Sequence, residues 1–587
     1  MAFRTGEHPV RRRRRARDAV GVIGVAIAVV AAGIVLPAVA SPGVVPQRAA
    51  GAVRTLSLRT TEPSAPSSLL SGPLADPGGT FLHDRFGRVV LLHGVNAVYK
   101  FAPYELYPDP GQPWNLSGRD ASQMASLGFD VVRLGVLWAG IEPGALGPNS
   151  PQVCTPGTPH DPGQFDPVVA AAYLTRLKQT VDLLGSYGIS TILDMHQDLY
   201  SSVFGGEGAP AWAVCTSGFP VVRAPGRWSN TYRTAALGAA FENFWTNDVV
   251  GDLQGEYDRV MASVAHFFRN DRHVLGYDPF NEPFSKSLLE VGHHALDAQI
   301  ECFYTGAARP GLASNTGRRV ACPPADPRKG LIGSVEGADP YHLVFYEPDI
   351  YSRHGTPNYV GSIDFPRLVM NFHSYCPYRN PVTGDPTDPA ACASSALVTL
   401  TRRSAERALL GSRAQPRGPA LFLSEFGATN DPGLLNAVTD GANRVLIGWT
   451  AWAWKYYGDP TGSSDEAIVG PDGQLQPGAR ALAQTYPQAV AGRPTSVVFD
   501  DETSAFAMTY VPDPRVQAPT VVFVPVAERY PDGYCPGVQG ARITSRPDAS
   551  HLVVANGTGD QPVTIRVTAG ECRSGARRTP SFLQHSS

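Results

Sequence analysis

Two glutamates of the chain stand where a carboxyl group is able to take part in chemistry. Glu282 and Glu425 each follow an apolar run with the composition of a buried strand. Glycoside hydrolysis needs two such groups, because one donates a proton to the leaving oxygen while the other, ionised, attacks the anomeric carbon. A spacing of roughly 5 Å gives retention of configuration and roughly 6.5–9.5 Å gives inversion. Structural hydrogen bonds or ion pairs are the alternative role for both glutamates.

Polar and aromatic residues also close the six other apolar runs of this part of the chain. They are Asn96 and Lys100; Arg133 and Trp138; Asp194, His196 and Asp198; Glu347; His373 and Tyr375; and Trp452 and Lys455. Asn281 directly precedes Glu282. One polar strand end would mean little, whereas a polar or aromatic group at every end is hard to explain by packing. We therefore expect these residues to share one functional surface.

The eight apolar runs are predicted to be strands with helices between several of them. The strands are expected at Val89–Ala97, Asp130–Trp138, Ser190–Gln197, Val274–Asn281, His342–Glu347, Leu368–Tyr375, Ala420–Glu425 and Gly448–Lys455. Helix signals include a cap at Ser117, a start at Asp166-Pro167 and an amphipathic stretch from Gln254 to Phe268. This alternation predicts an α/β fold, a parallel (β/α)8 TIM barrel, whose strands end on the one rim where such barrels carry active sites.

The pattern of apolar residues changes to period two after about residue 488, and no helical pattern follows. Strands are predicted at 496–499, 505–510, 520–524, 551–555 and 563–568, which indicates a small C-terminal antiparallel β-sandwich. The expected organisation is a catalytic barrel at 76–488, a sandwich at 489–575 and a tail at 576–587. We expect the sandwich to be a rigid companion of the barrel rather than a separate sugar-binding module.

The first 75 residues are predicted to lie outside the folded body. The basic block Arg11–Arg15 precedes an apolar run, Ala19–Ala40, that ends in Ala-Val-Ala, so residues 1–40 are expected to be a signal peptide and the protein to be secreted. An uncleaved membrane anchor is the alternative, because about 20 apolar residues span a bilayer. Residues 41–75, rich in Ser, Pro, Ala and Thr, are expected to form a flexible linker.

Composition and cysteine content narrow the class of protein. The chain has 587 residues, of which 43 % are hydrophobic and 17 % charged, with a net charge of −3, so wholesale disorder and a nucleic-acid partner are both excluded. Eight cysteines suit an exported protein with disulfides, and local pairing predicts 302–322, 376–392 and 535–572, which leaves 154–215. The chain lacks CxxC and zinc-type Cys/His spacings, so we expect no structural metal. We also expect no cofactor, and we expect the protein to be a monomer.

Several of these residues carry a resemblance to a known family. Asn281-Glu282-Pro283 after the fourth predicted strand and Glu425 after the seventh resemble glycoside hydrolase family 5, retaining (β/α)8 glycosidases, over roughly residues 80–485. Within that family, Leu92-His93-Gly94-Val95-Asn96, Asp194-Met195-His196-Gln197-Asp198 and the appended β-domain resemble the endoglycoceramidases, which cut the bond between glycan and ceramide in glycosphingolipids. A polysaccharide endoglycosidase such as a β-glucanase or mannanase is one alternative. A catalytically silent carbohydrate- or membrane-binding protein is another, although the presence of both glutamates argues against it.

The resemblance implies a role for each site residue. Glu282 is the expected acid/base, with its pKa raised by the charge of Glu425, and Glu425 is the expected nucleophile. Arg133 and Tyr375 are expected to form hydrogen bonds with Glu425, and Asn281 is expected to bind the sugar 2-hydroxyl. His196, Asp198 and His373 are expected to contact sugar hydroxyls or the acid/base. Trp452 is expected to stack beneath the reacting sugar. Lys100 and Lys455, two of only five lysines, are expected to meet at one rim, Lys100 as a donor to a sugar hydroxyl.

Two connections are long for a barrel. One, from Leu199 to about Asn247, is rich in aromatic residues, and the other, from Pro283 to about Tyr341, carries apolar residues that approximate one helix face. These residues either pack onto the barrel or, as the resemblance suggests, shape an apolar trough for a lipid aglycone. The expected substrate is accordingly a glycolipid or an oligosaccharide, and the aglycone side is expected to contact a membrane surface.

Overall fold

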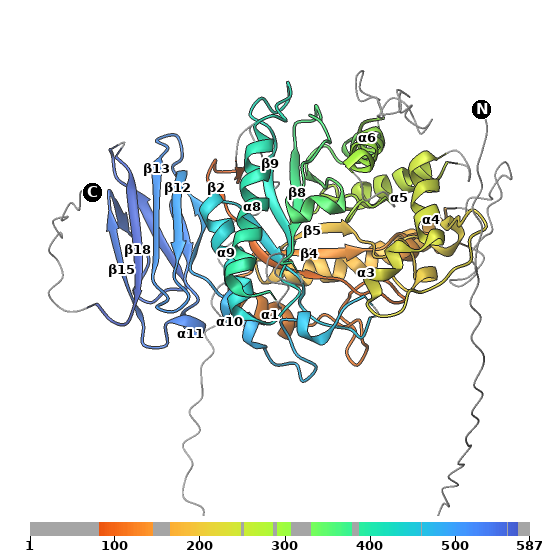
Figure 1. The fold of residues 1–587 in the computed structure, drawn as a ribbon. Coiled ribbons are helices and arrows are strands. Elements are labelled where there is room, and N and C mark those ends of the chain that lie inside the picture. The colour runs from red at the N-terminus through yellow and green to blue at the C-terminus, as the bar shows by residue number, and fades with distance from the viewer. Residues whose placement is uncertain are drawn as a thin grey trace, which may run out of the picture. The chain divides into compact units, whose positions relative to one another are not determined.

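Eight parallel strands close into a barrel in the computed structural model of the protein, which describes residues 81–144, 165–247, 252–285, 290–306, 330–377, 387–459, 461–559 and 561–572. Around the barrel the strands run in the order β10-β3-β4-β5-β6-β7-β8-β9 (Figure 1). They are β3 (His93–Ala97), β4 (Val131–Val136), β5 (Ser190–Met195), β6 (Val274–Asp278), β7 (Leu343–Tyr346), β8 (Leu368–Ser374), β9 (Ala420–Phe426) and β10 (Gly448–Ala451). All their residues are buried, as expected for strands covered on both faces. The predicted (β/α)8 barrel is confirmed.

Helices lie along the outside of the barrel and join its strands (Figure 1). The α-helices are α1 (Gly118–Leu127), α2 (Trp138–Ile141), α3 (Pro167–Ser186), α4 (Ala235–Thr246), α5 (Leu253–Phe268), α6 (Glu290–Thr305), α7 (Gly330–Ala338), α8 (Pro389–Arg407), α9 (Pro432–Val445), α10 (Pro477–Leu482) and α11 (Val526–Arg529). Short 3-10 helices are η1 (Ser202–Phe204), η2 (Ala211–Ala213), η3 (Trp228–Arg233), η4 (Ile350–His354) and η5 (Ser464–Glu466).

The capping residues named from the sequence begin the helices where they were predicted to. Ser117 and Asp120 form a reciprocal capping box at the start of α1, and Asp166 caps α3 with Pro167 in its first turn. Gly128 ends α1 at φ +88°, a left-handed conformation that glycine adopts without strain. These local signals fix where the helices begin, and so how long the connections to the next strands are.

Two antiparallel sheets, built mainly from strands that follow the barrel and completed by β1 and β2 before it, enclose a second core, so the predicted C-terminal β-sandwich is confirmed. One sheet has the order β1-β2-β11-β14-β17-β16 and the other β12-β13-β18-β15. The strands are β1 (Leu82–His83), β2 (Val89–Val90), β11 (Tyr486–Val490), β12 (Gly492–Phe499), β13 (Phe506–Pro512), β14 (Thr520–Phe523), β15 (Tyr534–Gln539), β16 (Ala541–Ile543), β17 (His551–Asn556) and β18 (Val563–Ala569). Sequence patterns missed β15, because Pro536 and Gly537 lower its strand propensity.

The first predicted strand, Val89–Ala97, is wrong as a single element. It is two strands in different sheets: β2 pairs with β1 and β11 of the C-terminal sheet, whereas β3 pairs with β4 and β10 of the barrel. Leu91 and Leu92, between them, are buried as well. The apolar run therefore does not break where the chain passes from one sheet to the other, and periodicity alone misses the boundary.

The C-terminal sheets pack beneath the amino-terminal ends of the barrel strands. His93, the first residue of β3, stacks between Trp449 of β10 at 4.2 Å and Tyr486 of β11 at 3.7 Å between ring centroids. The Tyr486 hydroxyl also donates to the carbonyl of Gly128, which precedes β4, at 2.7 Å. These contacts lie at the end of the barrel opposite to the rim where the site residues are found.

Two of the predicted disulfides, Cys376–Cys392 and Cys535–Cys572, are present. Cys302 is also disulfide-bonded, but its predicted partner Cys322 lies outside the described residues, as does Cys154, the predicted partner of the buried Cys215. The predicted signal peptide, linker and tail lie outside them too. Within the described ranges, none of the helices combines the length and the apolar character needed to cross a bilayer.

Candidate active site

Glu282 and Glu425 face one another at the carboxyl-terminal rim of the barrel. Glu425 lies in β9 and Glu282 follows β6, and one carboxylate oxygen of each lies within 4.8 Å of the other. Retaining glycosidases hold their two carboxyl groups roughly 5–5.5 Å apart, and this close approach agrees with that arrangement. Glu282 has φ +44°, which is strained for a residue with a side chain. Glu347 holds it there by accepting its backbone N–H at 2.8 Å.

Arg133 of β4 supports Glu425 from the barrel interior. The guanidinium is fully buried, and its nitrogens donate at 2.6–3.1 Å to five side chains: Asn96, Asp194, Asp278, Asn281 and Glu425. The Tyr375 hydroxyl donates to the second oxygen of Glu425 at 2.7 Å. Both oxygens of Glu425 thus accept a hydrogen bond, which fixes the carboxylate and complements its charge.

His373 of β8 lies between three glutamates. Its Nδ1 is 2.9 Å from Oε1 of Glu282 and 3.3 Å from Oε2 of Glu425, and its Nε2 is 3.5 Å from Oε1 of Glu347. Burial lowers the pKa of His373, but the three carboxyl groups outweigh it and raise the pKa to about 9. At neutral pH the ring is therefore an imidazolium that donates toward the pair of glutamates.

The electrostatics of Glu282 differ from the expectation. Burial raises its pKa, but the Arg353 guanidinium and the His373 ring together lower it to about 2. The Nη1 atom of Arg353 lies 3.1 Å from Oε1 and 3.4 Å from Oε2 of Glu282. The prediction of a raised pKa for Glu282 is thus wrong, because two cationic groups that the sequence pattern did not place beside Glu282 lie next to it.

Lys100 lies on a second wall of the site, beyond the end of β3. Its ammonium is 2.5 Å from Oδ2 of Asp198, 2.8 Å from the Thr461 hydroxyl and 3.4 Å from Oε1 of Glu207. It also lies 4.7 Å from the ring centroid of Trp452, a cation–π contact. The side chains of this wall can therefore offer both hydrogen-bond donors and acceptors, as recognition of sugar hydroxyls requires.

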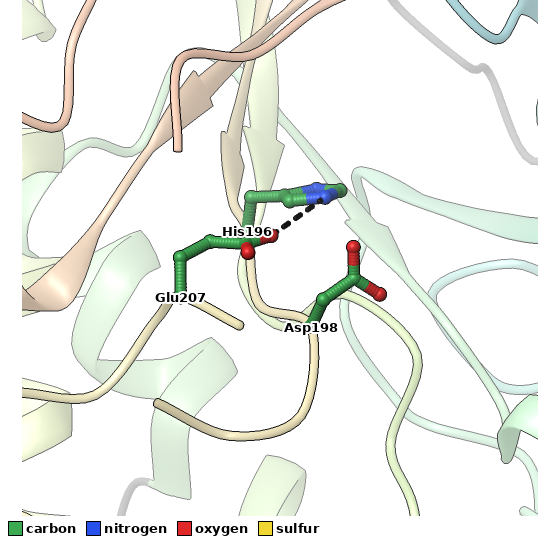
Figure 2. Close-up of side chains that lie close together, drawn as sticks. All are labelled: His196, Asp198 and Glu207. Atoms are coloured by element: carbon green, nitrogen blue, oxygen red, sulfur yellow. Dashed lines mark ion pairs between the residues drawn. The ribbon is translucent and has the colours of Figure 1, made fainter. Parts of the chain in front are cut away.

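His196, Asp198 and Glu207 converge beside Lys100, and the dashed line in Figure 2 joins Nε2 of His196 to Oε1 of Glu207, which lie 3.8 Å apart. The three offer atoms within 4.8 Å of one another, and a metal ion is a conceivable ligand for such a set. The Lys100 ammonium already occupies the cation position between the two carboxylates. The donor set therefore suits an ammonium, and we assign no metal to it.

The His196 ring has one nitrogen directed to a carboxylate and one available for a ligand. Its Nδ1 bonds Oδ2 of Asp194 at 2.7 Å, and burial together with the charge of Lys100 lowers its pKa to about 3. The neutral ring carries its proton on Nδ1, so Nε2 is an acceptor, and among the described residues it has no hydrogen-bond partner. The ring stacks on Trp452 at 5.2 Å between centroids.

The structure thus brings together the two glutamates and the eight residues expected to bind the substrate or the glutamates. The ammonium of Lys455 instead points away from this group. The pairing of β3 and β10 does place Lys100 and Lys455 at one rim, and both line a cavity with Trp452, Asp459 and Glu466. The Lys455 ammonium, however, pairs with Asp120 in the first turn of α1. It therefore supports a helix start rather than the wall beside Lys100.

Sequence reasoning missed Arg353, Glu207 and Asp278. Asp278 was detectable, because an acidic residue inside the apolar run of β6 needs a buried partner. Glu207 and Arg353 follow no strand directly and belong to no periodic pattern. Glu347, which closes the fifth predicted strand, contacts the backbone of Glu282 and the ring of His373.

Six large aromatic residues of the two long connections pack onto the barrel. Trp212, Phe241, Phe244, Trp245, Phe303 and Tyr304 are all at most 3 % exposed and belong to the main core. Leu288 and Leu289 lie outside the described residues. Of the two roles predicted for these connections, packing onto the barrel therefore applies to the six residues named above. A trough for a lipid would have to be formed by other residues.

Comparison with known proteins agrees with this geometry. A family model described as cellulase (glycosyl hydrolase family 5) matches residues 116–458, and one described as glycoside hydrolase family 5 C-terminal domain matches residues 484–567. Endoglycoceramidase I of Rhodococcus hoagii is 29 % identical over 83 % of this chain and 87 % of its own.

Two solved structures of endo-glycoceramidase II from Rhodococcus sp. share the fold. The lactosyl-enzyme intermediate has a TM-score of 0.59, and the ganglioside GM3 complex a TM-score of 0.60. Each is 24 % identical and covers 84 % of this chain, with 100 % and 99 % of the relative's chain matched. With its barrel, its C-terminal sheets and its pair of rim glutamates, the chain belongs to glycoside hydrolase family 5.

Proposed function

We propose that the protein is an exported, retaining endo-β-glycosidase that releases the glycan from the ceramide of glycosphingolipids. The observation that carries the proposal is the approach of Glu282 and Glu425 to within 4.8 Å, in a chain related over most of its length to an endoglycoceramidase. Export agrees with the disulfides of the folded part, since such bonds persist in oxidising compartments.

In the proposed reaction Glu425 attacks the anomeric carbon and Glu282 donates its proton to the departing ceramide oxygen. A glycosyl ester on Glu425 results, and ceramide leaves as an alcohol. Glu282, now a carboxylate, deprotonates a water molecule that attacks the same carbon, so that the free sugar forms and Glu425 leaves as a carboxylate. The lactosyl-enzyme intermediate of the Rhodococcus sp. relative supports such a two-step course.

Arg133 and Tyr375 orient Glu425 for attack in this mechanism. Asn281 gives one amide hydrogen to the carbonyl of Gln197 and accepts from Arg133, which leaves one donor and one acceptor for the 2-hydroxyl of the sugar. A bond to that hydroxyl tightens as positive charge develops at the anomeric centre. His373, as an imidazolium, balances the charge of Glu425 before the proton moves and that of Glu282 afterwards.

Trp452 is the proposed floor beneath the reacting sugar, with Lys100, Asp198 and His196 around its edge. Their geometry provides a cationic donor, a carboxylate acceptor and an imidazole acceptor within one wall. Sugar hydroxyls both donate and accept, so a wall of this composition favours glycan over any apolar group.

The protein is proposed to meet a lipid surface through the loop after η2. Phe219 and Val222 of this loop are 46 % and 51 % exposed, and exposed Arg223 follows them. Apolar tips flanked by arginine suit the headgroup region of a bilayer. The relative's complex with ganglioside GM3 supports a membrane-lipid substrate.

The test is to incubate the protein with a ganglioside in detergent micelles, with cello-oligosaccharides and with an aryl glucoside, and to separate the products. Free oligosaccharide together with ceramide supports the proposal. Cleavage of soluble glucans alone would instead indicate a polysaccharide endoglycosidase, and binding without turnover a silent protein. A Phe219→Ser/Val222→Ser double variant should lose activity on vesicles but keep it on the aryl glucoside.

A further inference from the structure

Arg353 is a cationic side chain that contacts the proposed acid/base and has no part in the mechanism above. It belongs to η4, which follows β7, and its guanidinium bonds both oxygens of Glu282. An acid catalyst must carry a proton, whereas a guanidinium at this distance favours the ionised carboxylate. This contact therefore favours the form of Glu282 that is unable to start the reaction.

The backbone that carries Arg353 is fixed to the segment that carries Glu282. The N–H of Ile350 donates to the carbonyl of Pro283 at 2.9 Å, and the Tyr351 hydroxyl donates to the carbonyl of Ser285 at 2.6 Å. Asp349 caps η4 by accepting from the N–H groups of Tyr351 and Ser352. A change in the contact between Arg353 and Glu282 must therefore come from the arginine side chain.

That side chain is free to move in a way that Arg133 is not. It is 32 % exposed, and its hydrogen bonds within the described part of the chain go only to Glu282 and to the ring of His354. A ligand that offers another acceptor is thus able to draw the guanidinium away.

Topology places Arg353 on the aglycone side. In the closed strand order, β7 is four strands from β3 in either direction, so the two stand directly opposite. Lys100, on the proposed glycan wall, follows β3, whereas Arg353 follows β7. The group that enters beside Arg353 is therefore the leaving group, not the sugar.

We propose that Arg353 is a specificity-determining residue that senses the leaving group: an aglycone with a hydrogen-bond acceptor near the scissile oxygen takes the guanidinium from Glu282 and frees that carboxylate to be protonated. The proton comes from solvent, and Glu282 then passes it to the glycosidic oxygen. The amide and hydroxyl groups of a ceramide are acceptors of this kind, whereas a simple alkyl chain has none. This inference rests on the function proposed above.

Other groups also face Glu282 and set its protonation together with Arg353. They are Asp194, Asp198, Tyr232, Glu347, His354, His373, Tyr375 and Glu425. Among them His373 is the second cation that lowers the pKa of Glu282. Removing Arg353 alone should therefore raise the pKa of Glu282 without bringing it to its value in a purely carboxylate site.

The test compares Arg353→Met and Arg353→Lys with the wild type on lactosylceramide, octyl β-lactoside and 2,4-dinitrophenyl β-lactoside. Arg413→Met is the matched control, since this arginine is 94 % exposed and pairs with Asp364 outside the site. For each pair kcat/KM is measured as a function of pH, and thermal melting checks the fold.

For Arg353→Met we expect the preference for lactosylceramide over octyl lactoside to fall about tenfold, the loss of one charged hydrogen bond. The high-pH limb on octyl lactoside should move upward by about one pH unit, because kcat/KM falls where the free enzyme loses the Glu282 proton and the variant keeps it longer. Dinitrophenyl lactoside needs no acid and should show no such movement. Arg353→Lys should retain the wild-type limb.

The proposal is overturned if Arg353→Met melts like the wild type and leaves both the substrate preference and the high-pH limb unchanged. It is also overturned if Arg413→Met produces the same changes. Failure of the function proposed above looks different: the wild type would then release nothing from lactosylceramide, while the pH limb on the octyl glycoside would still report on Arg353.

Discussion

Each of the two rim glutamates is paired with an arginine, and the two pairs are built differently. Arg133 is fully buried and bonded to five side chains, with Glu425 at 2.6 Å. Arg353 is 32 % exposed and reaches Glu282 at 3.1 Å from a short helix on the rim. The proposed nucleophile thus has a fixed countercharge, whereas the proposed acid has one that is able to leave.

The difference matches what the two carboxyl groups have to do. A nucleophile must be ionised whenever substrate arrives, so a permanent partner serves it. An acid/base must take up and release a proton in each cycle, so a permanent cation beside it would oppose the uptake of the proton. The same residue type therefore supports two functions because burial and bond number differ, as with other pairs of carboxyls set apart by environment.

The largest effect on activity is expected when the proposed nucleophile is removed. Glu425→Gln keeps the size of the side chain but lacks the charge that attacks the sugar, so turnover should fall by at least about 10⁴-fold on every substrate. The measurement is release of oligosaccharide from a glycolipid and of phenol from an aryl glycoside. Activity close to that of the wild type on either substrate would show that Glu425 is not the nucleophile.

Removal of the acid should discriminate between leaving groups. Glu282→Ala should lose roughly 10²–10⁴-fold on a glycolipid, whose alkoxide leaves poorly, and far less in the first step with dinitrophenyl glycosides. Added azide should replace the water that Glu282 no longer activates and appear as a glycosyl azide. Full activity of this variant on the native glycolipid would show that another group donates the proton.

Substitution of the two arginines should change the free energy of unfolding by different amounts. Arg133→Met leaves Asp194, Asp278 and Glu425 buried without their shared cation, and should cost about 3–5 kcal/mol in the free energy of unfolding. Arg353→Met removes a partly exposed pair and should cost less than about 1 kcal/mol. Urea unfolding of both variants measures the difference, and equal costs would contradict the distinction drawn between fixed and movable partners.

The imidazolium between the glutamates should make stability depend on pH. The pKa of His373 is raised to about 9 in the fold, above its ordinary value, so its contribution is complete below about pH 6.5 and is lost as pH rises through 9. Compared with His373→Gln, the wild type should lose up to about 3 kcal/mol more between pH 6 and 9.5. Urea unfolding at both pH values tests this, and parallel curves for the two proteins would count against a charged ring.

Much of the site was accessible from the sequence because a parallel barrel brings every strand end to one rim. Residues at those ends, such as Arg133, His373 and Tyr375, needed no more than a correct assignment of strands. The strands themselves were predictable from apolar runs, and two of the disulfides from local spacing. The run through Val89–Ala97 failed because burial in two different sheets gives the same pattern as burial in one.

Residues that reach the site from loops and short helices were not accessible in this way. Glu207 approaches Lys100 and Arg353 approaches Glu282 from positions that no periodic pattern marks. The direction of the pKa shift at Glu282 was therefore wrong: the charge of Glu425 was visible in the sequence, whereas the guanidinium 71 residues along the chain was not.

The amino-acid sequence by itself determined the alternation of strands and helices, the carboxyl pair and most of the polar rim, because these depend on order along the chain. Only the tertiary structure decided which charges surround each carboxyl group and how firmly they are held. Electrostatic interaction depends on distance and burial in space, and neither follows from separation along the chain.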